Sequence, residues 1–134
     1  MNVDPFLDSN IFLYAFSVQD LSKQKRASDL VNAPAIISSQ VINEVSNNML
    51  KKFGFGNDEV AQFVIDCYEQ YRVENISKET FVRASSLRDS YHFSYYDSLI
   101  VSAALLAGCT ILYSEDMQNG LIVDGVLTIV NPFA

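Results

Sequence analysis

The sequence predicts an α/β fold built on a mostly parallel sheet. Short apolar runs of strand length alternate with longer segments of helical periodicity throughout the chain. Hydrophobic residues make up 49% of the 134 residues and charged residues 19%, which is typical of a folded protein and unlike a disordered one. No repeat, low-complexity tract or linker divides the sequence. Residues 1–134 are therefore expected to form a single domain.

The N-terminal part is expected to contain two strands and three helices. A strand at residues 5–7 ends in a tight turn and is followed by a short helix. A second helix is expected over residues 21–31, ahead of a second strand at 35–38. A serine, Ser38 or Ser39, then caps a helix whose apolar residues recur every four positions, namely Val41, Val45 and Met49.

The C-terminal part is expected to contain three further helices and three further strands. The helices are predicted at residues 57–71, 77–91 and 97–107, and the strands at 72–76, 109–113 and 126–130. The last helix is apolar on almost every side, so it should be packed between other elements. Gly108 ends this helix, since a glycine commonly follows a helix C-terminus.

Four acids are expected to converge at one edge of the sheet. Asp8 follows the first strand and Asp116 follows the strand at 109–113. Ligands of open α/β sheets bind at the carboxyl ends of the strands, where both of these acids lie. Asp97 lies in the first turn of the apolar helix, and Glu44 lies one turn into the helix after the second strand.

Each of these acids also has a purely structural explanation. Asp8 could cap the short helix that follows it, and Asp97 stands three residues after Ser94, close to a capping-box arrangement. Glu44 could be an ordinary surface residue and Asp116 a turn residue. The joint pattern favours a site, because capping does not require acids at the ends of two central strands.

A cluster of four carboxylates requires a cation. Two like charges about 4 Å apart repel by about 4 kcal/mol at the effective dielectric near a protein surface. Uncompensated acids would therefore take up protons or destabilise the fold. Mg²⁺, with Mn²⁺ as a substitute, suits such a set of oxygen ligands best. The net charge of −7 agrees with an acidic centre, although solubility alone explains it equally well.

The composition disfavours other kinds of site. His92 is the only histidine, which argues against a zinc site and against a Ser-His-Asp triad. Cys67 and Cys109 lie in apolar stretches without metal-ligand spacing, so buried free thiols in a reducing cytoplasm are expected. The longest apolar run, residues 99–109, is too short to cross a membrane, and no secretory leader is recognised.

The ordered set of acids resembles the PIN-domain nucleases, and is most similar to the VapC-type toxins of bacterial and archaeal toxin–antitoxin pairs. The resemblance covers essentially the whole chain in the order and spacing of the acids. It rests on four parts of the sequence: Phe6–Asn10, Glu44, Ser94–Ile100 and Leu112–Asp116.

The resemblance implies a three-layer, Rossmann-like PIN domain and a Mg²⁺-dependent endoribonuclease that hydrolyses RNA with metal-activated water. The metal-binding and catalytic acids would be Asp8, Glu44, Asp97 and Asp116, with Asn10 and Ser114 as supporting polar residues. The resemblance also implies a homodimer and a small cognate antitoxin that blocks the acidic pocket. A non-catalytic PIN-like module that binds RNA or protein is the alternative, against which the intact set of acids argues.

Few basic residues are available to contact RNA. Lys51 and Lys52 end the helix that carries Glu44 and are candidates for contacts with the RNA backbone. Their favourable interaction with the helix dipole is the simpler competing explanation. Two other Mg²⁺-binding classes lack a residue that they need. A receiver domain needs an acidic pair after the first strand and a late lysine, and a haloacid-dehalogenase-type phosphatase needs Asp-x-Asp where this chain has Asp8-Ser9-Asn10.

Overall fold

The computed structural model describes residues 3–134 and is organised around a six-stranded sheet. The strands are β1 (Phe6–Leu7), β2 (Ile36–Ser38), β3 (Arg72–Glu74), β4 (Ile111–Tyr113), β5 (Ile122–Val123) and β6 (Leu127–Val130). Their order across the sheet is β3-β2-β1-β4-β6-β5. Neighbouring strands are parallel except β5 and β6. The predicted α/β fold with a mostly parallel sheet is confirmed.

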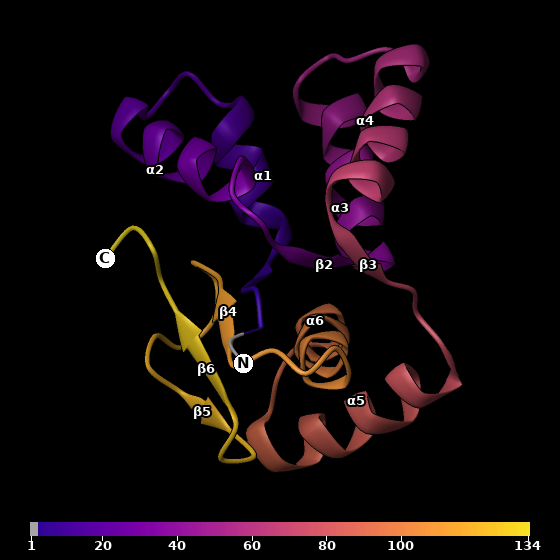
Figure 1. Ribbon diagram of the computed structural model, residues 1–134, viewed down its shortest axis with the longest axis vertical. Helices are drawn as coiled ribbons and strands as arrows, with labels where there is room; N and C mark the ends of the chain where they lie inside the picture. The colour runs from indigo at the N-terminus through magenta and orange to yellow at the C-terminus, as the bar shows by residue number, and fades with distance from the viewer. Residues whose placement is uncertain (1–2) are drawn as a thin grey trace.

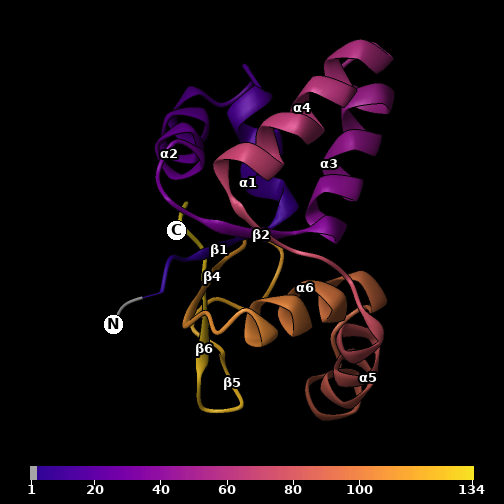
Figure 2. The ribbon, with the colours of Figure 1, turned by 45° about the vertical axis from the view of Figure 1, so that its right-hand side comes forward.

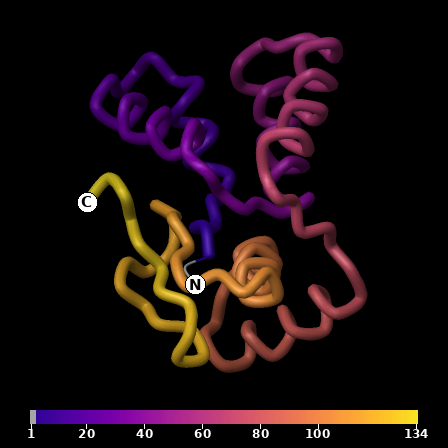
Figure 3. The backbone as a smooth tube through the Cα atoms, in the orientation of Figure 1, coloured from indigo at the N-terminus to yellow at the C-terminus, as the bar shows by residue number. Residues whose placement is uncertain are grey.

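Six helices flank this sheet (Figure 1). They are α1 (Ser9–Phe16), α2 (Leu21–Val31), α3 (Ser39–Lys52), α4 (Asn57–Gln70), α5 (Lys78–Tyr91) and α6 (Tyr95–Leu106). In Figure 2, α1 to α4 lie above β1 and β2, and α5 and α6 lie below them. Helices on both faces of a parallel sheet give the expected three-layer arrangement. After β6 the chain turns back toward α1 and α2 (Figure 3), and the Phe133 ring packs against Tyr14 with 4.9 Å between ring centroids.

Each predicted strand is shorter in the structure, and two of them are shorter by two residues because backbone groups at their ends bond elsewhere. The strand predicted from residue 109 begins at Ile111, since the Cys109 N–H donates to the Ala104 carbonyl and closes the last turn of α6. The strand predicted to residue 76 ends at Glu74, since the Ile76 N–H donates to the Ser39 hydroxyl at 2.9 Å. Neither N–H group is free to join a neighbouring strand.

Strand β5 was not predicted from the sequence. It has two residues and pairs antiparallel with β6, where Val123 lies opposite Leu127. Val123 is fully buried, whereas Ile122 is exposed. A two-residue segment is too short to display an alternating pattern, so periodicity offered no signal for it.

Helix α6 is packed between other elements, as its composition predicted. Every residue from Ser98 to Leu105 is buried. The helix begins at Tyr95, two residues before the predicted start, because the Ser94 hydroxyl accepts a hydrogen bond from the Asp97 N–H and caps it. The buried Ser102 hydroxyl donates to the Thr80 carbonyl at 2.8 Å, which satisfies it and ties α6 to α5.

The register of the central strands determines which residues meet at the carboxyl edge. Leu7 lies opposite Tyr113 in the β1–β4 pair, and both strands end at these residues. The Asp8 N–H continues the pairing by donating to the Tyr113 carbonyl at 3.0 Å. Asp8 and Ser114, the next residues along the two strands, are therefore brought together.

The remaining expectations about thiols and membranes concern individual segments. Cys67 and Cys109 are buried and unpaired, as expected. Burial raises the pKa of the Cys67 thiol to about 12 and that of Cys109 to about 11, so both are protonated at neutral pH. Within residues 3–134, none of the helices has the length and apolar character needed to span a bilayer.

The turn after α6 yields a test of the fold. Gly108 has a φ of +79°, and a Cβ atom placed there would meet no atom within 4 Å. Gly108→Ala should therefore lower the free energy of unfolding by about 1–2 kcal/mol through backbone strain alone. Gly108→Asn should lower it less, because asparagine tolerates this conformation. Urea unfolding measures both values, and an alanine variant as stable as the parent would contradict the prediction.

Candidate active site

Asp8 occupies the centre of the carboxyl edge and has two structural duties. It follows β1 directly and is the N-cap of α1. Its Oδ1 accepts a hydrogen bond from the Ser9 N–H at 2.7 Å, and its Oδ2 accepts one from the Ser114 hydroxyl at 2.8 Å. The residue is only 3% exposed. Asp8 therefore both caps α1 and belongs to the acidic centre.

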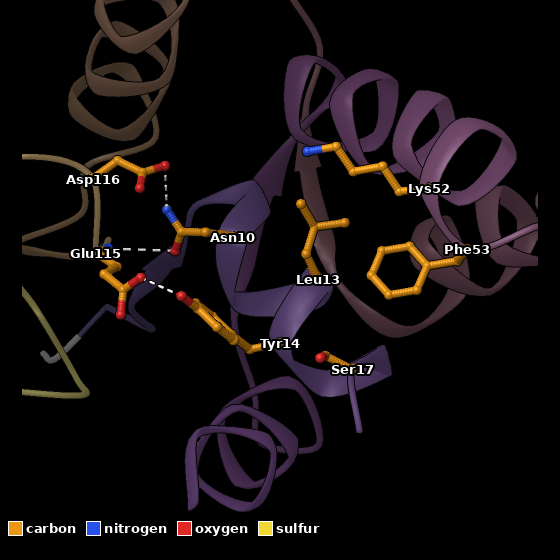
Figure 4. Close-up of a pocket in the computed structure, with 8 residues that line it drawn as sticks. All are labelled: Asn10, Leu13, Tyr14, Ser17, Lys52, Phe53, Glu115 and Asp116. Atoms are coloured by element: carbon orange, nitrogen blue, oxygen red, sulfur yellow. Dashed lines mark hydrogen bonds between the residues drawn. The ribbon is translucent and has the colours of Figure 1, made fainter. Parts of the chain in front are cut away.

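Asn10 and Ser114 connect Asp8 with Asp116. The Asn10 amide donates to Asp116 Oδ2 at 3.1 Å and lies 3.5 Å from Asp8 Oδ2. The fully buried Ser114 hydroxyl donates to Asp8 and accepts from the Asp116 N–H at 3.2 Å. Figure 4 shows the Asn10 side chain pointing at the loop that carries Asp116. Both predicted supporting residues thus lie between two of the predicted acids.

Glu44 and Asp97 come from two helices on opposite sides of the sheet, α3 and α6. Both acids are half-buried. The Oε2 atom of Glu44 is buried and has no hydrogen-bond partner among the described residues. Glu44 also lines a pocket of about 260 Å³ with Tyr96, which precedes Asp97. Helix α3 therefore directs Glu44 toward the beginning of α6.

Charge repulsion couples all four acids with one another. Burial, followed by repulsion from Asp97 and Asp116, raises the pKa of Asp8 from 3.8 to about 6, although hydrogen bonds from Ser114 and Ser9 oppose the rise. Burial and repulsion from the other three acids raise the pKa of Glu44 from 4.5 to about 7. The pKa of Asp97 is raised by burial and by Asp116.

These residues have the chemistry of a divalent-cation site. Within residues 3–134, no three side chains of His, Cys, Asp or Glu are gathered closely enough to hold a metal ion. A cation that takes oxygen ligands fits the burial of Asp8 and the Oε2 atom of Glu44, to which no other described residue forms a hydrogen bond.

A second polar cluster, which no sequence pattern indicated, lies beside this centre. Lys23 of α2 forms an ion pair with Glu115 at 2.6 Å, and the Tyr14 hydroxyl of α1 donates to the other oxygen of Glu115. Partial burial alone would raise the pKa of Glu115, but the hydrogen bonds from Lys23 and Tyr14 hold it below its ordinary value. The contact depends on how α1 packs against α2, which sequence periodicity does not reveal.

The two lysines at the end of α3 differ in position. Lys52 lines a pocket next to the acids together with Asn10 and Asp116, whereas Lys51 is not among the residues that line it. Both lysines are exposed. Ser9, which sequence reasoning left without a role, contributes hydrogen bonds that lower the pKa of both Asp8 and Glu44.

Comparison with known proteins identifies the class to which this fold and site belong. The model of the PIN domain family matches residues 6–118, a range that includes all four acids. The chain belongs to the PIN domain family. Its sequence has no significant match among curated proteins.

Solved structures with the same fold include several toxin–antitoxin proteins. A toxin–antitoxin complex from Klebsiella pneumoniae is 23% identical, with a TM-score of 0.69 over 96% of this chain and 98% of that one. VapC20 from Mycobacterium tuberculosis, a toxin that cleaves the sarcin–ricin loop, is 18% identical, with a TM-score of 0.69 over 84% and 90%. DNA-bound VapBC from Salmonella typhimurium is 14% identical, with a TM-score of 0.67 over 95% and 96%. At these identities the likeness establishes the fold.

The raised pKa values predict how stability depends on pH in metal-free buffer. Asp8 and Glu44 have higher pKa values in the folded chain than their ordinary values of 3.8 and 4.5. Their contribution is thus fully present below about pH 4 and is lost as the pH rises through about 6 and 7. Asp8→Asn should flatten this decline by about 3 kcal/mol, the equivalent of about two pKa units. Urea unfolding in EDTA from pH 4 to 8 measures this decline in the free energy of unfolding. An unchanged slope in the variant would argue against a buried charge at Asp8.

Proposed function

We propose that this protein is a Mg²⁺-dependent endoribonuclease and the toxin of a type II toxin–antitoxin pair. The observation that carries the proposal is the convergence of Asp8, Glu44, Asp97 and Asp116 at the carboxyl edge of the sheet, with electrostatic coupling among all four. Membership of the PIN domain family supports it, as do the toxins among the structures of similar fold. Retention of every acid argues for an active member of the family.

The four acids would hold one or two Mg²⁺ ions, or Mn²⁺ in their place. Such an ion would supply Lewis acidity to activate water and positive charge to offset that of the scissile phosphate. Ser114 and Asn10 fix the carboxylates of Asp8 and Asp116 through hydrogen bonds of 2.8 and 3.1 Å. Glu44, whose buried Oε2 has no hydrogen-bond partner among the described residues, would orient the attacking water or hold a second ion.

The proposal extends to products and partners. Resemblance to VapC-type toxins implies 5′-phosphate and 3′-hydroxyl ends on the cleaved RNA and a homodimeric toxin. The two buried free thiols support a cytoplasmic location. The resemblance also implies a small antitoxin that covers the acidic centre. The structures of similar fold include complexes of toxins with antitoxins, which supports the search for such a partner.

Cleavage of RNA tests the activity directly. The parent protein should cut mixed RNAs in Mg²⁺ and stop when EDTA is added. Asp8→Asn and Asp116→Asn should each reduce the rate by at least about a hundredfold, because each removes a charge from the cation site. Asp58→Asn, which changes an exposed acid in the first turn of α4, serves as the matched control. Metal-dependent RNA binding without cleavage would favour the non-catalytic alternative.

Binding of the cation can be tested without any RNA. Millimolar Mg²⁺ or Mn²⁺ should raise the melting temperature by several degrees, because a ligand that binds only the folded state stabilises it by mass action. Sodium chloride at equal ionic strength controls for general screening of the acids. Asp8→Asn should be more stable than the parent in EDTA and should gain less from the metal. A parent protein with no shift at millimolar metal would contradict the assignment.

A further inference from the structure

A mostly apolar pocket adjoins the acidic centre. It has a volume of about 290 Å³ and lies between α1, the end of α3 and the loop after β4. Its apolar wall is formed by Leu13, Tyr14 and Phe53. Asn10 and Asp116 line the pocket and also belong to the acidic centre, so the two sites are continuous (Figure 4).

The charges around the pocket are unevenly compensated. Glu115, an acid on its rim, is neutralised by the ion pair with Lys23. In the part of the chain that the structure describes, the ion pairs join Lys23 to Glu115 and Arg83 to Asp124, so Lys52 takes part in neither. Figure 4 shows the Lys52 side chain pointing toward the side of the pocket formed by Asn10 and Asp116. Lys52 is therefore a positive group available to a ligand.

We infer that this pocket receives the nucleotide adjacent to the scissile phosphate, with Lys52 contacting a phosphate of that nucleotide. The inference rests on the proposed function and adds a site to it. An RNA strand whose scissile phosphate lies at the acids must pass over the surface next to them as it leaves the centre. This pocket is part of that surface, because it shares Asn10 and Asp116 with the centre. The wall of Leu13, Tyr14 and Phe53 provides an apolar surface for the base or ribose, a sequence-tolerant mode of contact.

Size and charge together favour a nucleotide as the occupant. The volume lies at the lower end of the range for pockets that hold small molecules, about 300–1,000 Å³, so the pocket accepts one nucleotide rather than a stretch of strand. An ammonium group next to an apolar wall complements the anionic phosphate and the flat base of a single nucleotide. A segment of a protein partner is the competing occupant, and the experiments below separate the two.

Lys51 provides a matched control for Lys52. Both lysines lie in the last turn of α3, so loss of either removes one cation near the same helix C-terminus and changes the net charge equally. They differ in that Lys52 alone of the pair lines the pocket. A difference in RNA cleavage between Lys52→Ala and Lys51→Ala is therefore due to the contact in the pocket. It cannot be due to the helix dipole or to net charge, which change equally in both variants.

The first experiment compares the two variants in cleavage of a short RNA by the full chain in Mg²⁺ over a range of salt concentrations. Lys52→Ala should lower kcat/KM by about tenfold at low salt, as expected for loss of a charged contact. For Lys52→Ala, the slope of log kcat/KM against log salt concentration should be shallower by about one unit. Lys51→Ala should have a smaller effect on both. Equal effects of the two variants would overturn the inference.

A second variant tests the pocket through its volume. Ser17 lines the pocket and is half-buried at the end of α1, so Ser17→Phe would fill part of the space. Cleavage should fall, whereas the Mn²⁺-dependent rise in melting temperature should persist because the acids are unchanged. A variant that keeps the parent's cleavage but no longer binds an antitoxin would make the pocket a protein-docking site and overturn the inference.

The parent protein separates failure of this inference from failure of the proposed function. A parent that does not cleave RNA in Mg²⁺ contradicts the proposed function, and the nucleotide pocket with it. An active parent whose Lys52→Ala variant matches Lys51→Ala contradicts the pocket alone. Melting curves of all variants without metal show whether a loss of cleavage reflects unfolding.

Discussion

The pairing of β1 with β4 is the constraint on which the rest of the site depends. Because Leu7 lies opposite Tyr113, the two strands end level with each other, and Asp8 meets Ser114 beyond them. A shift of this register by one residue would turn Asp8 to the other face of the sheet. The adjoining polar network, the cap of α1 and the position of Asp116 all follow from this one alignment. The buried apolar side chains of both strands stabilise it, since Phe6, Leu7 and Leu112 are fully enclosed.

The same alignment makes the centre electrostatically unfavourable in the absence of a cation. Asp8 is buried beside other acids, and its hydrogen bonds with Ser9 and Ser114 only partly offset the effect of burial on its pKa. Glu44 is in a similar position, with a buried oxygen that has no hydrogen-bond partner within residues 3–134. Such local conflict is expected at functional sites, where the surrounding structure supplies the stability that the site itself lacks. Here that stability comes from the enclosed helix α6 and the strands beside it.

Much of the architecture could be predicted, because long amphipathic or apolar segments determine it. Helix α2 begins and ends at the predicted residues, and α5 begins one residue after its predicted start and ends at the predicted residue. What escaped prediction depends on single backbone groups or on packing between helices. The Cys109 N–H bonds within α6, which shortens β4, and the contact between Lys23 and Glu115 joins residues far apart in the sequence. Asp8 and Asp116 could be placed at the carboxyl edge because strand ends are visible in the sequence, whereas the difference between Lys51 and Lys52 requires the fold.

The short outer strands of the sheet have a consequence for how this chain associates with others. Strand β5 has two residues and strand β3 has three. The first and last residues of β3, Arg72 and Glu74, are charged. Edges this short offer few unpaired N–H and C=O groups, so they are poor templates for adding a strand from another molecule. The sheet is thereby protected from edge-to-edge aggregation. Partners of this protein are accordingly expected to bind through helices and side chains rather than by extending the sheet.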